Sequence, residues 1–154
     1  IRRAQALMEA AGDDGDFDAL CQQLHRYQAT LRTCFTLENF DNLIKNGRMR
    51  PIVGTLLRSL GIHIIADATA EGTIHVADKA RGVGKTYRAI TALMKASKDC
   101  TDAEVVISHC ENLEGAMALK RQILADLPVK QVDLLSCRGL TSFYAMEKGL
   151  IVGY

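Results

Sequence analysis

The chain has 154 residues, a length that suits one substantial hydrophobic core, and 48% of its residues are hydrophobic against 24% charged. Nineteen basic and eighteen acidic residues leave a net charge of +1, so bulk electrostatics does not favour nucleic acid or an anionic membrane as a partner. No apolar run in the sequence approaches the roughly 20 residues that a membrane-spanning helix needs. Any anion-binding site in this chain must therefore be local.

The chain contains five cysteines, an odd number without Cys-X-X-Cys spacing: Cys21, Cys34, Cys100, Cys110 and Cys137. This pattern suits buried thiols in a reducing compartment better than a disulfide framework or a structural zinc site. It favours a cytoplasmic location. The chain opens on an isoleucine that runs directly into helix-like sequence, so we expect a fragment whose upstream part is missing.

Helix signals dominate the first part of the chain. Residues 4–11 are helix-compatible. From Asp16 onward, apolar residues such as Phe17 and Leu20 recur at helical spacing, with polar residues on the opposite face of the helix. We expect residues 1–32 to form a helical segment that leads in from a missing N-terminal domain.

A short strand and a helix are predicted next. Residues 33–35 are β-prone, and Thr36 is placed to cap a helix that ends at Asn46 and Gly47. The apolar stripe expected for that helix consists of Leu37, Phe40, Leu43 and Ile44.

Residues 45–50 form the most basic short run of the chain. A guanidinium from Arg48 or Arg50 in this loop can bind a carboxylate or phosphate through two parallel hydrogen bonds. A solvated loop, or an arginine that closes a helix C-terminus, explains the run equally well. Pro51 suits the first position of a further apolar helix that ends at Gly61.

The remaining sequence alternates strands and helices. Two β-prone runs predict a hairpin around Glu71 and Gly72, and a helix and then a strand–helix–strand unit with parallel strands and a right-handed connection follow. The expected ranges are 62–65 and 73–76 for the hairpin, 84–98 for the helix, and 103–108, 112–127 and 130–136 for the βαβ unit. With the Gly-punctuated tail at 149–154, this order predicts an α/β fold, a mixed sheet flanked by helices.

Gly82–Thr86, with the sequence GVGKT, resembles the end of a phosphate-binding P-loop. Its glycines would let backbone amides approach a phosphate, and Lys85 would neutralise charge. The full pattern requires a glycine where this chain has Lys79, and a core strand where 77–81 predicts a polar turn. A glycine turn with a basic helix start is the competing interpretation.

Histidines and cysteines offer two further hypotheses. His109 and Cys110 suggest a nucleophile and its base, but neighbours on an extended segment point to opposite faces. A metal site from His63, His75 and His109 would require the hairpin and the later strand to converge, which their spacing does not enforce. We expect no metal and no cofactor. A thiol enzyme using Cys110 or Cys137 stays open as an alternative.

Residues 138–144 combine an arginine, two hydroxyls and a glycine that leaves backbone amides accessible. A carboxylate headgroup needs donors of this kind, here Arg138, Thr141 and Ser142. The competing interpretation is a helix N-cap at Thr141 or Ser142.

Several of these segments, taken in order, resemble the C-terminal half of the DegV family. The resemblance runs from about Thr33 onward through LIKNGRM at 43–49, ISHCENLEGAMALK at 107–120 and the terminal GLIVGY. Its most specific part is the run of Leu37, Phe40, Leu43, Lys45, Gly47 and Arg48, combined with the terminal glycine motif.

The resemblance implies a two-domain α/β protein that holds a long-chain fatty acid in a buried tunnel and presents its carboxylate to a partner kinase, without being a catalyst itself. Residues 33–154 would form the lipid-binding lobe. Burial contributes roughly 0.8 kcal/mol per methylene, so a long acyl chain can bind tightly without a strong polar anchor. The residues expected to bind lipid are Arg48, Ile52, Leu56, Leu60, Ile62, Ile64, Arg138, Thr141 and Ser142. The alternative is a small phosphate-handling or thiol enzyme that uses Gly82–Thr86, Cys110 or Cys137.

The chain departs from the family pattern at its last glycine motif. Many members carry glycine, any residue, histidine, threonine, glycine, proline, glycine there. When the final glycine is matched to Gly149, Ala145 stands where the histidine belongs and Lys148 where the proline belongs. A lobe separated from its partner domain would also expose an apolar junction surface, so we expect self-association.

Overall fold

The computed structural model describes residues 1–12, 15–49, 61–69 and 71–154. The chain divides into two compact units, Ile1–Leu31 and Arg32–Tyr154. The first unit contains helices α1 (Arg2–Ala11) and α2 (Phe17–Thr30), and the Asp16 carboxylate caps α2 by accepting a hydrogen bond from the Asp18 amide at 2.9 Å. Both helices predicted in this region are therefore confirmed. None of the described helices is long and apolar enough to cross a bilayer.

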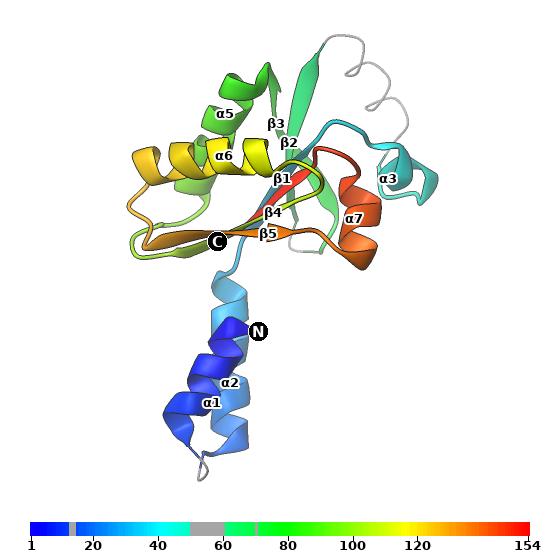
Figure 1. Ribbon diagram of the computed structural model, residues 1–154. Coiled ribbons are helices and arrows are strands. Elements are labelled where there is room, and N and C mark those ends of the chain that lie inside the picture. Colours follow the sequence, from blue (N-terminus) through cyan, green and yellow to red (C-terminus); the bar gives the residue numbers. More distant parts are fainter. Residues whose placement is uncertain (13–14, 50–60, 70) are drawn as a thin grey trace. The chain divides into compact units, whose positions relative to one another are not determined.

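The second unit contains six described strands that form one sheet in the order β3-β2-β1-β6-β4-β5 (Figure 1). The strands are β1 (Thr33–Leu37), β2 (Ile62–Ala68), β3 (Ile74–Arg81), β4 (Glu104–His109), β5 (Gln131–Ser136) and β6 (Leu150–Gly153). Strands β4 and β5 are parallel, and the other described pairs are antiparallel. The predicted mixed sheet is confirmed, as are the hairpin formed by β2 and β3 and the parallel βαβ unit.

Helices α5 (Val83–Ser97) and α6 (Leu113–Asp126) lie side by side over one face of this sheet (Figure 1). Strand alternation brings apolar residues such as Val105 and Ile107 to that face, where they meet Ile90 of α5 and Leu119 and Ile123 of α6. All five side chains are fully buried. This layer is the main hydrophobic core of the second unit.

The opposite face carries a second apolar cluster, beside the short helices α3 (Asp41–Lys45) and α7 (Gly139–Ala145). Its buried members are Leu37, Phe40, Leu43, Ile64, Ala66 and Ala145. Half-buried apolar residues from the strands pack against it, among them Phe35, Ile62, Ile74, Val76 and Ile151. Several of the described apolar side chains on this face are therefore partly accessible to solvent.

Several local predictions are wrong, among them Leu37, which was expected on a helix and lies at the end of β1. Thr36 does not cap a helix, because it pairs with Ile65 and Leu150 inside β1, and α3 begins only after Phe40. The expected polar turn at 77–81 is the second half of strand β3. The hydroxyls of Thr141 and Ser142 do not cap α7, whose N-cap is Arg138. The predicted helix from Pro51 lies outside the described residues.

Candidate functional site

Helices α3 and α7 bring the expected headgroup-binding segments together on the second face of the sheet. The Asn42 side-chain amide donates to the Phe143 carbonyl oxygen at 2.6 Å and ties one helix to the other. Just after α3, the Arg48 amide donates to the Leu43 carbonyl oxygen at 2.8 Å. The Arg48 guanidinium then lies over the ring of Tyr144, with Cζ 5.1 Å from the centroid. We call Arg48, Tyr144 and the α7 residues around them the arginine site.

The other residues that were predicted to bind lipid differ in their exposure and in the elements on which they lie. Arg138 and Thr141 are exposed at the start of α7, and Ser142 is half-buried within it. Ile62 and Ile64 lie on β2 and belong to the second apolar cluster, in which Ile64 is fully buried. Ile52, Leu56 and Leu60 lie outside the described residues, as do Arg50, Val53 and Leu57.

The backbone of the loop between α7 and β6 requires a glycine at Gly149 and is incompatible with a proline in place of Lys148. A Cβ on Gly149 would collide with the Ala145 carbonyl oxygen, so only glycine fits there. Lys148 has a φ of 65°, in the left-handed region. Proline is locked near −65° and cannot adopt that conformation, so this loop has a backbone that the family's proline would not permit.

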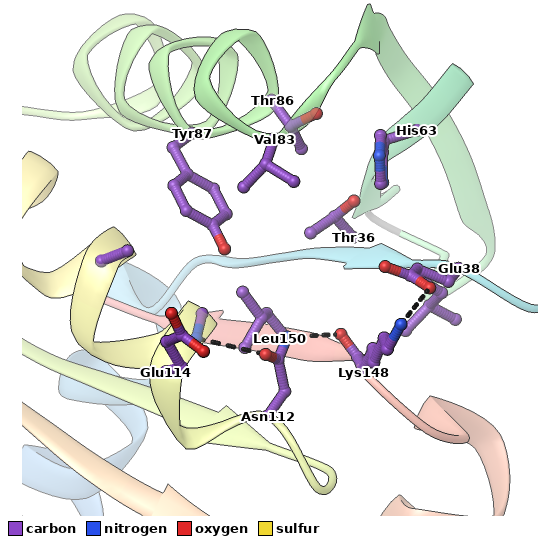
Figure 2. Close-up of a pocket in the computed structure, with 13 residues that line it drawn as sticks. Thr36, Glu38, His63, Val83, Thr86, Tyr87, Asn112, Glu114, Lys148 and Leu150 are labelled. Atoms are coloured by element: carbon purple, nitrogen blue, oxygen red, sulfur yellow. Dashed lines mark hydrogen bonds and ion pairs between the residues drawn. The ribbon is translucent and has the colours of Figure 1, made fainter. Parts of the chain in front are cut away.

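A cavity of about 270 Å³ opens on the other face of the sheet, where α5 and α6 begin (Figure 2). It is lined by residues from both helix starts, from β1 and β2, and from the loop before β6: Thr36, Leu37, Glu38, His63, Val83, Thr86, Tyr87, Asn112, Glu114, Gly115, Ala118, Lys148 and Leu150. We call it the helix-start cavity. None of the described residues that were predicted to bind lipid lines it.

The walls of the helix-start cavity are held by polar contacts. Asn112 caps α6 by accepting from the Gly115 amide at 3.2 Å, and its side-chain amide donates to the Lys148 carbonyl oxygen at 2.9 Å. The Lys148 ammonium lies 3.6 Å from the Glu38 carboxylate (Figure 2). These contacts join the start of α6 to the loop before β6.

Negative charge and burial shape the chemistry of this cavity. Burial raises the pKa of the Tyr87 phenol, and the nearby carboxylates of Glu38 and Glu114 raise it further. The Thr36 hydroxyl is buried and has no hydrogen-bond partner within the described part of the chain. Glu38 and Glu114 are both exposed, and Glu38 is paired with Lys148, so the walls of the cavity carry charges of both signs.

The GVGKT segment lies at the edge of this cavity and does not have the arrangement of a phosphate loop. It follows β3, which is an edge strand of the sheet. The Thr86 hydroxyl is buried and donates to the Gly82 carbonyl oxygen at 3.1 Å, so it is already engaged within its own helix. Lys85 is exposed. The phosphate-handling hypothesis therefore gains no support from this geometry.

The histidine and cysteine candidates are likewise not arranged for nucleophilic catalysis. His109 is buried, and its Nδ1 accepts from the Asn112 amide at 3.4 Å. Burial raises the pKa of the Cys137 thiol, and the neighbouring Cys110 adds to that shift, which lowers the thiolate population. In the described residues, no group of three or more His, Cys, Asp or Glu side chains is placed to hold a metal ion.

Comparison with known proteins settles the family. A family model described as an uncharacterised protein of the DegV family matches residues 3–150. The chain belongs to the DegV family. A DegV domain-containing protein from Streptococcus gordonii is 31% identical over 151 residues, which cover 97% of this chain and 53% of the relative. The chain thus spans about half the length of the curated DegV relatives it matches, and the family expected from the sequence is confirmed.

Solved DegV structures share the fold and show bound lipids. A DegV family protein from Eubacterium eligens loaded with heptadecanoic acid matches with a TM-score of 0.89 and 25% identity, over 99% of this chain and 54% of that one. The Streptococcus pneumoniae fatty acid kinase (Fak) B3 protein loaded with linoleic acid matches with a TM-score of 0.85 and 30% identity, over the same shares. The α/β architecture of this DegV chain is therefore that of the family.

Proposed function

We propose that this chain is part of a fatty-acid carrier that binds a long-chain fatty acid and presents its carboxylate to a kinase, without catalysing a reaction itself. The observation that carries the proposal is membership of the DegV family together with two similar structures that hold heptadecanoic and linoleic acid. The kinase partner is suggested by the fatty acid kinase B3 protein, which has the same fold over this region.

The arginine site is the proposed position of the fatty-acid carboxylate. Arg48 is exposed and carries a planar guanidinium that can bind a carboxylate through two parallel hydrogen bonds. The Arg48 guanidinium lies over the Tyr144 ring, and α7 adds the hydroxyls of Thr141 and Ser142, with the cation of Arg138 next to it in sequence. In the helix-start cavity the Lys148 ammonium is already paired with Glu38, so it is less available than Arg48 to a carboxylate.

The second face of the sheet is the proposed wall for the acyl chain. Ile62 and Ile64 lie on this face, which retains half-buried apolar side chains that a hydrocarbon could cover. Ile52, Leu56 and Leu60 stay part of the proposed wall. At roughly 0.8 kcal/mol per buried methylene, the acyl chain supplies most of the affinity, and the arginine supplies orientation. Residues 33–154 would then form the lipid-binding lobe.

Two smaller proposals accompany this function. All five cysteines of the chain are free thiols, which suits a reducing cytoplasmic setting.

Self-association also stays a prediction, and sedimentation velocity at several concentrations tests it. An association that grows with concentration is expected, and a monomer at every concentration would contradict it.

Calorimetric titration with linoleic acid and with its methyl ester tests the carrier function. A carrier should bind the acid saturably and the ester more weakly, because the ester has no charge for Arg48 to bind. If neither compound binds to this chain or to a longer protein that contains it, the proposed function is wrong. Equal binding of acid and ester would instead show that the arginine site does not bind the carboxylate.

A further inference from the structure

Two cysteines lie next to each other where the parallel strands β4 and β5 end. The strands pair in register from Glu104 with Gln131 to His109 with Ser136. Cys110 and Cys137 are the next residue of each strand. The Cys137 amide still donates to the His109 carbonyl oxygen at 2.7 Å, so the two chains stay adjacent at this point.

Strand alternation turns both thiols to the same side of the sheet. On β4, Ile107 and His109 are buried, and Ile107 belongs to the core under α5 and α6, so Cys110 points to the opposite face. On β5, Val132 and Leu134 belong to that same core, and Cys137 lies at an odd spacing from both. Both cysteines pack against the second apolar cluster, which agrees with this parity.

Both thiols are also accessible to small molecules. Each is half-buried and free, and the two line one open surface depression together with Ser142 of α7. Neighbouring strands lie about 4.8 Å apart, and disulfides join residues whose Cα atoms are about 4.4–6.8 Å apart. The strand register therefore brings the two cysteines within disulfide range.

We propose that Cys110 and Cys137 form a reversible disulfide that ties the end of β4 to the start of α7. The reaction is an exchange with a small-molecule disulfide such as glutathione disulfide. The two protein thiols lose two protons and two electrons and form one S–S bond, and the small disulfide is reduced to two thiols. Side chains on adjacent parallel strands point side by side, so the bond is strained and readily reduced, as expected of a reversible one.

The bond would change the surroundings of α7. Cys110 Sγ now donates to the Ser142 carbonyl oxygen at 4.0 Å, and this contact is lost if the sulfur turns to Cys137. Cys137 is separated from the first residue of α7 only by Arg138. Because α7 carries Tyr144, oxidation alters the support of Arg48. This link to lipid binding rests on the proposed function, whereas the disulfide itself does not.

Peptide mapping of the full chain tests the disulfide. The protein is equilibrated with graded ratios of reduced and oxidised glutathione, alkylated, and digested with trypsin without reduction. The expected product joins peptides 99–120 and 131–138, with a loss of about 2 Da from the intact protein that dithiothreitol reverses. Peptide 99–120 also contains the buried Cys100, so the Cys100→Ser variant should keep the link, while Cys110→Ser and Cys137→Ser should abolish it.

Two results would overturn the proposal. One is a link that disappears in Cys100→Ser. The other is wild-type protein that carries only mixed disulfides with glutathione at every ratio. The regulatory consequence is measured separately, as the dissociation constant for linoleic acid in reduced and oxidised protein. A difference of several-fold that is absent in Cys137→Ser is expected, and equal constants in a protein shown to be fully cross-linked would refute the effect on lipid binding.

Discussion

The Arg48 guanidinium lies over the Tyr144 ring, 5.1 Å from its centroid, and so joins the loop after α3 to helix α7. An exposed cation–π contact contributes about 0.5–1 kcal/mol, which is enough to hold an arginine in one orientation and too little to hold the fold. Orientation is what a bidentate carboxylate contact requires.

Replacing this arginine is therefore expected to affect binding more than stability. Arg48→Ala should weaken fatty-acid binding about ten-fold or more, the effect of losing a charge-assisted hydrogen bond, and lower the free energy of unfolding by at most about 1 kcal/mol. Calorimetry and urea unfolding measure the two effects. Lys45→Ala, which removes an exposed cation from the same basic run, is the matched control and should leave affinity within about two-fold. Equal losses in both variants would contradict a specific role for Arg48.

The two buried threonines beside the helix-start cavity should respond in opposite directions to the same substitution. The Thr36 hydroxyl has no partner among the described residues, so Thr36→Val should be neutral or stabilise the protein by about 1 kcal/mol. The Thr86 hydroxyl donates to Gly82, so Thr86→Val should destabilise it by about 1 kcal/mol. Urea midpoints of the two variants provide the comparison. Destabilisation by Thr36→Val would show that its hydroxyl has a partner.

Asn112 has two separable tasks. Its oxygen caps α6, and its amide nitrogen donates to the Lys148 carbonyl oxygen. Asn112→Asp keeps a capping oxygen and removes the donor, whereas Asn112→Ala removes both. We expect Asn112→Ala to lower the free energy of unfolding by about 1–2 kcal/mol, with a smaller loss for the aspartate. Losses of equal size in thermal unfolding would mean that the cap contributes nothing.

The buried phenol of Tyr154 predicts a loss of stability at alkaline pH. Burial raises the pKa of Tyr154 to about 12 from an ordinary value of 10.0, and its hydroxyl lies 2.7 Å from the Ser97 hydroxyl. Above pH 10 the unfolded chain loses this proton while the folded protein keeps it. The stabilisation is therefore complete below pH 10 and is lost as the pH rises towards 12.

Unfolding in urea at pH 8 and near pH 11 tests this expectation. Tyr154→Phe should cost about 1 kcal/mol at pH 8, because the hydrogen bond is lost, and should decline less than the wild type at the higher pH. Burial also raises the pKa of Cys34 to about 12, so some alkaline decline remains in the variant. An unchanged decline in Tyr154→Phe would assign the whole effect to other groups.

The sequence predicted the elements whose apolar pattern has one unambiguous period. The helix that follows Asp16 was of this kind, and the βαβ unit was also predicted close to its observed bounds. Leu37 was misassigned because it lies three residues before Phe40 and six before Leu43, a spacing that suits one helix face. In the structure all three contact one core, but Leu37 reaches it from the end of β1. Local periodicity could not distinguish the two arrangements.

The helix-start cavity was not predictable because its residues come from distant parts of the chain. Thr36, Tyr87 and Lys148 lie on different elements and meet only through the order of the strands. The capping contact of Asn112 is local in sequence, but its second contact, with Lys148, depends on the pairing of β4 with β6. The proximity of Cys110 and Cys137 depends in the same way on the register of β4 and β5.

The carrier function is tested most directly by native mass spectrometry of the purified chain after incubation with linoleic acid, with denaturing spectra and organic extraction of the same sample. A fatty-acid carrier should show one added mass equal to a single fatty acid, which disappears on denaturation and is weaker in Arg48→Ala. A spectrum that shows only the polypeptide mass, both for this chain and for a longer protein that contains it, would contradict the proposed fatty-acid carrier.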